Sequence, residues 1–584
     1  RILAGKKEFA AMKKAVNSGR NPYLVRMHED YIEMADECVE SNQTITYSPN
    51  GSGKLLLVSR ETTRQLMCCA YAWRFTGARK YLVRAESVLK DVCAFETWHP
   101  EHYLDVSEMA IAVAIAYDWL YSALGENTRK ACEYALTHYS MDTAEREDLV
   151  RLFHKENNWG QVLNAGLIAS CIAIYETDPQ RCRSLIRRSV ECNAENIDFG
   201  YAPDGVYPEG AMYWGYGTSY QILLLDMLSH CYGTDFGISN CKGFRESAYY
   251  EIFANGNIKM IYNYSDSGPL IKPHNELWWF AHRFNDPSLL YSELQYWDRH
   301  SKEKFNNKLG AMHILNASKV KVKNVQKPSQ NIFYGNGINP IVIARTGWSK
   351  EDLYLGMKGG KASNPHGHMD AGSFVFEAFG VRWIREPSFS SYETNEKALA
   401  SIGKTLWALR QDSYRWKLWG YGCREHSCYV VNDKDHCVTG TATIKQVHES
   451  PERMGGTLSM TDVFGGDLQE AERTICIVDK SYLEIRDIIV APSDREAKIR
   501  WTVNASVTPQ LGQDGIILKS GSRTMLLKAE GAEITYGIWS SDPKDYDNPA
   551  AFFQKPSKND HPCGFTFTVP AGAKVELTTT LKAI

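Results

Sequence analysis

The chain has 584 residues, with 66 Lys and Arg against 69 Asp and Glu and a formal net charge of −3. This balance argues against nucleic acid as the main partner, although a local basic cleft for an anionic substrate stays compatible with it. A chain of this length exceeds what one hydrophobic core supports, so we expect two or three domains. No apolar run approaches the roughly 18 residues of a membrane span, and we expect no such span.

The cysteine pattern indicates neither a zinc ribbon nor a dense disulfide framework. There are 15 cysteines, an odd number, and no two of them form a CxxC pair. We therefore expect most of them to be buried thiols. Residue 1 is not Met, so we expect that an export signal has been removed.

The first part of the chain, residues 9–316, has the apolar spacing of successive helices. Apolar residues recur at intervals of three and four positions between short Gly, Pro and Asp/Asn breaks. The clearest segments are Glu61–Phe75, Lys80–Phe95, Ser107–Leu124, Asn164–Glu176, Arg181–Ile197 and Thr218–Cys231. Many helices of this length joined by short loops predict an α/α toroid or solenoid.

After Lys327-Pro328-Ser329 the pattern changes to short, alternating, β-branched segments bounded by turns. Such segments predict antiparallel sheets packed as a sandwich. Examples are Pro340–Arg345, Cys428–Asn432, Tyr482–Val490, Lys498–Val503, Phe565–Val569 and Lys574–Thr580, and the main helical or irregular interruption is Asn395–Gln411. We place the domain boundary near residue 325, giving domains 1–325 and 326–584, and expect the active site where the two domains meet.

The segment Asn364–Phe374 concentrates two imidazoles and a carboxylate, His366, His368 and Asp370, within five residues. In an extended segment alternate side chains share a face, so we expect these three to converge on one small volume. That arrangement suits a proton-transfer group beside a metal ligand. The alternative is a polar strand face exposed to water.

Three further motifs accompany this segment. Glu156–Gly160 places Asn157 and Asn158 just before a predicted helix. The two side chains are predicted to donate hydrogen bonds to a ligand, and a helix cap is the alternative. Pro203–Gly217, with its glycines and prolines, predicts an irregular loop that presents tyrosines, or a structural loop lined by aromatic rings. Arg424–Val431 leads a histidine into a strand, where a satisfied structural histidine is the alternative.

The order of these motifs, Asn-Asn-Trp, Glu-Gly-x-x-Tyr-Trp-x-Tyr, His-x-His-x-Asp-x-x-Ser-Phe and Glu-His on a strand, resembles that of heparinase II/III-type polysaccharide lyases and their alginate-lyase relatives. Trp98–Asp105 and Tyr117–Tyr121 are also similar to the helical domain of this group. The resemblance implies a multidomain α + β architecture, an N-terminal incomplete (α/α) toroid followed by a C-terminal antiparallel β-sandwich. This architecture agrees with the helices and strands that the apolar spacing predicts.

The resemblance also implies β-elimination at a uronic acid, in which the C5 proton is removed, the O4 leaving group departs and a 4,5-unsaturated uronate remains. Asn158, with Asn157 beside it, matches the position that neutralises the substrate carboxylate. Tyr213 and His366 match the base and acid. Tyr213 alone serves both roles for a glucuronate-type geometry, His366 is the base for an iduronate-type geometry, and Tyr216 is the alternative tyrosine.

By the same resemblance His368 and His426 are metal ligands, and Glu386 stands where relatives often have an aspartate. Two histidines and a carboxylate suit one structural divalent ion, Zn or Ca, and a hydrogen-bonded polar cluster is the alternative. No organic cofactor is expected.

The expected substrate is an acidic polysaccharide, and we expect heparin or heparan sulfate rather than alginate because cationic side chains cluster near the predicted site. The expected substrate-binding residues are His102, Arg382, Arg415, Arg424 and Trp214. Exposed arginines are also common on any sandwich. The branch of the family that the chain resembles includes exo-acting members.

Two other classes of function remain open from the sequence. A glycoside hydrolase on an α/α toroid would use paired carboxylates, Asp105 with Glu108 or Asp204 with Glu209. A non-catalytic carbohydrate-binding protein would keep the aromatic residues without a reaction. The lyase hypothesis predicts that the protein is found in the bacterial periplasm or on the cell surface. The sequence does not indicate the oligomeric state.

Overall fold

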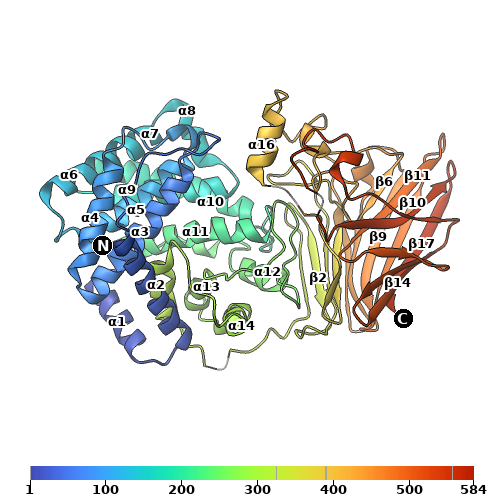
Figure 1. Ribbon diagram of the computed structural model, residues 1–584, viewed down its shortest axis with the longest axis horizontal. Helices are drawn as coiled ribbons and strands as arrows, with labels where there is room; N and C mark the ends of the chain where they lie inside the picture. Colours follow the sequence, from blue (N-terminus) through green and yellow to red (C-terminus); the bar gives the residue numbers. More distant parts are fainter. Residues whose placement is uncertain (1, 324, 389–390, 556) are drawn as a thin grey trace. The chain divides into compact units, whose positions relative to one another are not determined.

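The computed structural model describes residues 2–323, 325–388, 391–555 and 557–584. The chain divides into two compact units (Figure 1). The first contains residues 1–202, 213–248 and 272–327, and the second contains residues 203–212, 249–271 and 328–584. The sequence division near residue 325 assigns the segments 203–212 and 249–271 to the helical part, whereas the structure packs both with the strands.

The first unit is built from helices, as its apolar spacing predicts. They are α1 (Lys6–Asn17), α2 (Pro22–Ser41), α3 (Leu56–Thr76), α4 (Arg79–Cys93), α5 (Leu104–Leu120), α6 (Glu126–Ala135), α7 (Asp142–Ala144), α8 (Glu147–Val150), α9 (Asn158–Ala173), α10 (Pro179–Tyr201), α13 (Leu277–Arg283), α14 (Tyr291–Arg299) and α15 (Gly310–Ala317). Two more, α11 (Ala211–Tyr232) and α12 (Glu246–Ala254), begin or end in the second unit. Successive helices α3, α5, α9 and α10 pack side by side, as an α/α toroid requires.

Helix α5 forms the centre of this unit. Every residue from Leu104 to Leu120 is buried, and the helix packs against both α3 and α9. The approach to α9 is close: a Cβ added at Gly166 would lie 2.8 Å from the Cα of Ser107. Glycine at this point therefore sets the separation of two central helices.

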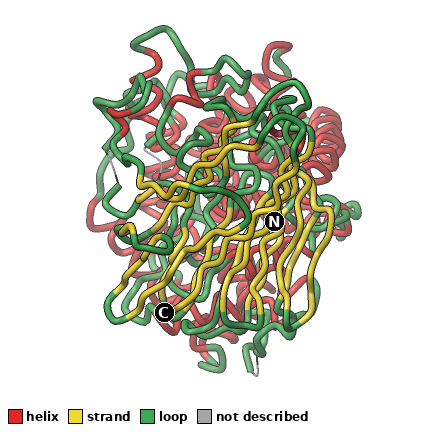
Figure 2. The backbone as a smooth tube through the Cα atoms, turned by 90° about the vertical axis from the view of Figure 1, so that its right-hand side faces the viewer, coloured by secondary structure: helices red, strands yellow, loops and turns green. Residues whose placement is uncertain are grey.

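The second unit contains two antiparallel sheets, whose strands lie side by side in Figure 2. The strands are β1 (Ile332–Gly335), β2 (Ile341–Arg345), β3 (Tyr354–Lys358), β4 (Phe374–Ala378), β5 (Val381–Ile384), β6 (Tyr429–Val431), β7 (Thr443–Ser450), β8 (Arg453–Ser459), β9 (Glu470–Val478), β10 (Tyr482–Val490), β11 (Ala497–Ala505), β12 (Pro509–Leu511), β13 (Ile516–Ser520), β14 (Arg523–Glu530), β15 (Thr535–Ile538), β16 (His561–Val569) and β17 (Lys574–Ala583). One sheet has the order β1-β2-β3-β4-β5-β11-β16-β15 with β6 beside β11, and the other β12-β13-β14-β17-β10-β9-β8-β7.

One hydrophobic core joins the two sheets. It takes Phe376, Trp501 and Phe565 from the first sheet and Ile475 and Ile485 from the second. In the second sheet, buried and more exposed residues alternate along β10, whereas β2, β3 and β4 of the first sheet are buried along their whole length. The sandwich expected from the sequence is confirmed. The interruption expected at residues 395–411 contains α16 (Tyr392–Ala400) followed by turns.

The segment 249–271 is fastened to the first sheet by buried charged groups. Arg345 donates to the backbone oxygens of Phe253 and Asn255, at 2.8 and 2.9 Å. Glu377 accepts from the backbone N–H of Asn257 at 2.7 Å. These bonds satisfy backbone groups at the end of α12 and in the residues that follow it, and they bind this part of the segment to the first sheet.

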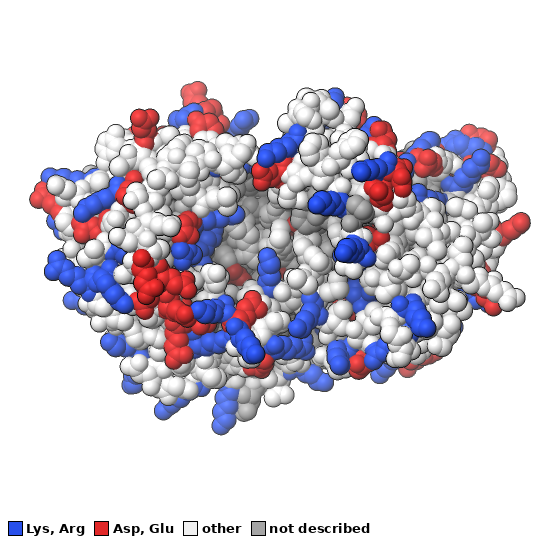
Figure 3. All heavy atoms as spheres, viewed as in Figure 1, with Lys and Arg blue, Asp and Glu red and all other residues white. Residues whose placement is uncertain are grey.

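The face drawn in Figure 3 carries both Lys and Arg and Asp and Glu side chains, in line with the small net charge. Among the described residues, none of the helices combines the length and apolarity needed to cross a membrane.

Candidate active site

The segment carrying His366 and His368 is a series of turns, not the extended strand predicted from the sequence. His366 has a φ of +57°, and a Cβ added at Gly367 would lie 2.4 Å from the carbonyl oxygen of Ala362. The chain therefore folds back on itself here, and side chains do not alternate between two faces. His366 and His368 turn toward one carboxylate, while Asp370 pairs with the buried Lys358 instead.

The shared carboxylate is Asp266, which is fully buried. Its oxygens lie 3.0 Å from His366 Nδ1 and 2.8 Å from His368 Nε2. The Tyr392 hydroxyl donates to it at 3.0 Å, and Arg415 donates at 3.2 Å. Burial would raise the pKa of Asp266, but Arg415 and the two histidines outweigh it and hold that pKa well below its usual range.

This network fixes the orientation of His366. Its Nδ1 faces Asp266, and its Nε2 lies 3.3 Å from Glu209 Oε1. The imidazole is thus placed between carboxylates from two segments, 203–212 and 249–271, that join the second unit from the helical half of the sequence. A ring nitrogen fixed in this way is suited to proton transfer.

A second polar group surrounds His426. Its Nδ1 lies 2.6 Å from Glu386 Oε2, and the other oxygen of Glu386 accepts from Ser373 at 2.7 Å. Burial would lower the pKa of His426, but the bond to Glu386 outweighs it and raises that pKa. His426 Nε2 and Asp370 Oδ2 have no hydrogen-bond partner among the described residues.

The predicted metal set fits this geometry poorly. The ligand atoms of His368, Glu386 and His426 do not all lie within 4.8 Å of one another. Both oxygens of Glu386 and the Nε2 of His368 are occupied by protein partners. These contacts match a hydrogen-bonded polar cluster. The metal remains a prediction, and the proposed reaction is derived without it.

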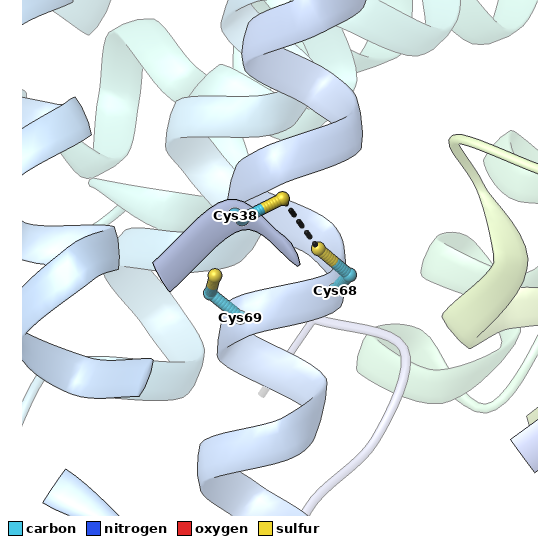
Figure 4. A group of neighbouring side chains, drawn as sticks. All are labelled: Cys38, Cys68 and Cys69. Atoms are coloured by element: carbon cyan, nitrogen blue, oxygen red, sulfur yellow. Dashed lines mark hydrogen bonds between the residues drawn. The ribbon is translucent and has the colours of Figure 1, made fainter. Parts of the chain in front are cut away.

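Within the described residues, the one group of three side chains close enough to share an ion is Cys38, Cys68 and Cys69 (Figure 4). The three thiols are buried between α2 and α3, with 3.6 Å between the sulfurs of Cys38 and Cys68. Most of the 15 cysteines are buried, as expected.

The first unit carries the predicted amide and tyrosine residues at two helix N-termini. Asn157 is the N-cap of α9, where its side chain accepts from the backbone N–H of Trp159 at 3.1 Å, and Asn158 is the first residue of the helix. Tyr213 is the third residue of α11. The expected irregular loop therefore ends at Gly210, whose φ of +88° precedes the helix. A helix N-terminus favours nearby negative charge, which suits a carboxylate-binding amide and a tyrosinate.

Tyr216, the alternative tyrosine, is engaged in a different contact. Its hydroxyl donates to the buried Glu108 at 3.0 Å. Burial, followed by the charge of Glu108, raises the pKa of Tyr216 well above its usual range. The Tyr216 hydroxyl is therefore committed to Glu108. Arg60 and Lys308 also pair with Glu108, and Arg60 keeps 39% of its side chain exposed.

Three of the expected substrate-binding side chains are inaccessible. Arg382 is buried and bonded to Glu377, and Arg415 is buried against Asp266. Trp214 is fully buried in the helical core. The sequence interpretation misjudged them because a guanidinium or indole looks the same in a sequence whether it is exposed or paired inside the protein.

The other two expected substrate-binding residues keep some exposure. His102 holds its Nδ1 2.7 Å from Asp105 and lies edge-on to Trp159. Arg424 pairs with Asp433 and Asp435 and keeps 26% of its side chain exposed.

Asp266 is the residue that the sequence interpretation missed. It lies in Tyr264-Ser265-Asp266-Ser267-Gly268-Pro269, an ordinary turn signal, 100 positions before His366. A turn signal identifies a loop but not the partner of its carboxylate, so no local pattern could have placed it beside the histidines.

Residues 343–557 match the family model described as heparinase II/III-like, C-terminal. The chain thus carries a heparinase II/III-like C-terminal domain. This domain includes both histidine groups, from His366 to His426. No curated protein sequence matches the chain.

Solved structures resemble most of the chain. A heparan sulfate lyase, HepC, from Pedobacter heparinus aligns with a TM-score of 0.59 and 12% identity, covering 95% of this chain and 82% of the lyase. A structure of heparinase III aligns with a TM-score of 0.57 and 12% identity, covering 90% of this chain and 77% of that one. The helical unit followed by the heparinase II/III-like domain is therefore the fold of these lyases, an α/α toroid with a β-sandwich.

Proposed function

We propose that this protein is a polysaccharide lyase that cleaves a uronic acid-containing glycosaminoglycan, of the heparin and heparan sulfate class, by β-elimination. The observation that carries the proposal is His366, oriented by Asp266 within a heparinase II/III-like domain. The solved heparan sulfate lyase and heparinase III, which share the fold, support the choice of substrate class.

In the proposed reaction the C5 proton of a uronate is removed, the electron pair forms the C4–C5 double bond, and the O4 substituent leaves with a proton. The C5 proton is weakly acidic while the adjacent carboxylate keeps its charge. Asn158 at the N-terminus of α9 is assigned to neutralise that carboxylate and to stabilise the enolate-like intermediate. Asn157 caps the same helix by accepting a hydrogen bond from the backbone N–H of Trp159.

Tyr213 and His366 are assigned the proton transfers. Tyr213 lies in the first turn of α11, where a helix favours nearby negative charge, and this position supports its assignment as a base. For glucuronate, Tyr213 takes the C5 proton and returns it to O4; for iduronate, His366 takes it and Tyr213 protonates the leaving oxygen. We assign the protein to the bacterial periplasm or cell surface, where such substrates are encountered. We also propose that it cleaves units from the chain ends.

A glycoside hydrolase is the less favoured function because its carboxylates are committed elsewhere. Asp105 binds His99, His102 and the backbone N–H of Leu55. Burial would raise the pKa of Glu108, but Lys308 and Arg60 outweigh it and lower that pKa to about 2. A carboxylate so stabilised does not serve as a general acid.

The test is ultraviolet absorbance during incubation with heparin, heparan sulfate, chondroitin sulfate, hyaluronan and alginate. We expect the band of an unsaturated uronate on heparan sulfate or heparin. Tyr213→Phe should lower kcat by about 10²-fold or more, and Tyr216→Phe, the matched control, by less than about tenfold. His366→Ala should abolish activity on iduronate-containing chains. New reducing ends without the band would indicate hydrolysis and refute the proposal.

A further inference from the structure

Trp407 is an exposed aromatic side chain beside the candidate catalytic histidine. The chain has 15 tryptophans, all among the described residues, and Trp407 is the most exposed of them, at 44%. Solitary exposed apolar residues are common in proteins. The surroundings of this indole set it apart from such residues.

The exposed indole is held in place rather than free to rotate. Its Nε1 donates to Glu396 Oε1 at 2.9 Å. Its ring lies perpendicular to His366, with 5.7 Å between centroids, and packs against Tyr392 at 5.1 Å. Its backbone N–H donates to Thr405 at 3.2 Å. Binding a ligand on such a ring costs little conformational entropy, because the rotamer is already selected.

The same contacts connect Trp407 to the Asp266 network. Tyr392, which packs on the indole, donates to Asp266, and His366 contacts both rings. The indole is therefore fixed relative to the imidazole that is assigned a proton transfer. A ligand lying on the exposed part of Trp407 would be next to His366.

The ligand chemistry that fits is a pyranose ring. The C–H groups of a sugar form an apolar patch that packs on an aromatic face, while its hydroxyl and sulfate groups stay in water. An indole anchored by one hydrogen bond offers apolar area without charge, so it recognises the ring shape rather than the sulfation pattern. Trp214, the tryptophan expected from the sequence to contact substrate, has no accessible face.

We propose that Trp407 is a stacking platform for a pyranose unit of the polysaccharide, next to the uronate on which His366 acts. The proposal rests on the proposed lyase function and assigns this part of the surface, beside α16, to substrate binding. Stacking on Trp407 stabilises the bound substrate and the transition state by similar amounts. Loss of the indole should therefore change KM more than kcat.

The kinetic test compares wild type with Trp407→Ala and Trp407→Phe on the substrate that gives product. Loss of about half the apolar area of an indole should raise KM about tenfold in Trp407→Ala, with kcat within about threefold. Trp407→Phe should restore part of the affinity. Phe552→Ala is the matched control: Phe552 is 88% exposed, and its removal should leave both constants unchanged.

A binding test separates this inference from the proposed function. Oligosaccharides of the five polysaccharides are titrated into Tyr213→Phe, with intrinsic tryptophan fluorescence as the signal, and again into Tyr213→Phe/Trp407→Phe. A saturable change present in the first and reduced in the second supports the platform, even if wild type forms no unsaturated product. An unchanged KM in Trp407→Ala, or a fluorescence change of the same size and affinity in both variants, would overturn it.

Discussion

Replacing Arg415 with Met tests whether the Asp266 network depends on a buried ion pair. The guanidinium is fully buried and donates to Asp266 at 3.2 Å and to the backbone oxygen of Gly367 at 3.0 Å. It also lies over the ring of Tyr421, at 4.3 Å from the centroid. Methionine fills much of the volume of the arginine stem but leaves the Asp266 carboxylate without its cation.

The expected cost follows from the burial of both partners. Removing one member of a buried pair leaves an uncompensated charge and typically costs about 3–5 kcal/mol. At about 2 °C per kcal/mol for a unit of this size, the melting temperature should fall by roughly 6–10 °C. Adding Asp266→Asn removes the stranded charge, so the double variant should be less destabilised than the sum of the two single variants.

The assay is urea and thermal unfolding followed by near-ultraviolet circular dichroism, which reports the packing of aromatic side chains. Arg410→Met is the matched control, because Arg410 is 79% exposed and pairs with an exposed Asp412. It should change the free energy of unfolding by less than about 1 kcal/mol. Equal effects of the two substitutions, or strict additivity with Asp266→Asn, would refute the buried-pair reasoning.

Three further predictions concern stability. Trp501→Ala should lower the free energy of urea unfolding by about 3–5 kcal/mol, since Trp501 is fully buried and stacks on Phe565, and a loss below about 1 kcal/mol would contradict this packing. Burial raises the pKa of Glu293 to about 7, so the folded state binds more protons than the unfolded state between about pH 4.5 and 7. Stability should therefore fall by up to about 3 kcal/mol from pH 5 to pH 8 in wild type, and by correspondingly less in Glu293→Gln; equal pH dependence would refute the assignment. Gly166→Ala should cost about 1–3 kcal/mol because its Cβ would press on Ser107, and an unchanged melting temperature would show that α5 and α9 separate freely.

The periodicity of the sequence predicted the type of element in each unit and several of the elements themselves. Apolar spacing of three and four predicted helices such as α3 and α10, and alternation predicted strands such as β10 with its observed bounds, Tyr482–Val490. These patterns are local, because a helix or strand must place its apolar side chains on one face. Motif order likewise led to the heparinase II/III-type resemblance, which the family model supports for residues 343–557.

Local patterns failed where backbone geometry or burial decided the outcome. The His366 segment has polar residues at alternate positions, which suggested a strand, but the positive φ of His366 and the close approach at Gly367 make it a turn. The start of α11 was expected to be a loop because of its glycines, yet the helix begins at Ala211.

What the sequence by itself determined is the succession of helices and strands and the chemical types of the candidate site residues. Only the tertiary structure decided which of them act together. Asp266 and His366 are 100 positions apart and meet in the second unit, where Arg345 and Glu377 bind other residues of segment 249–271. The physical reason is that a buried charge must find its partners in space, wherever they occur along the chain.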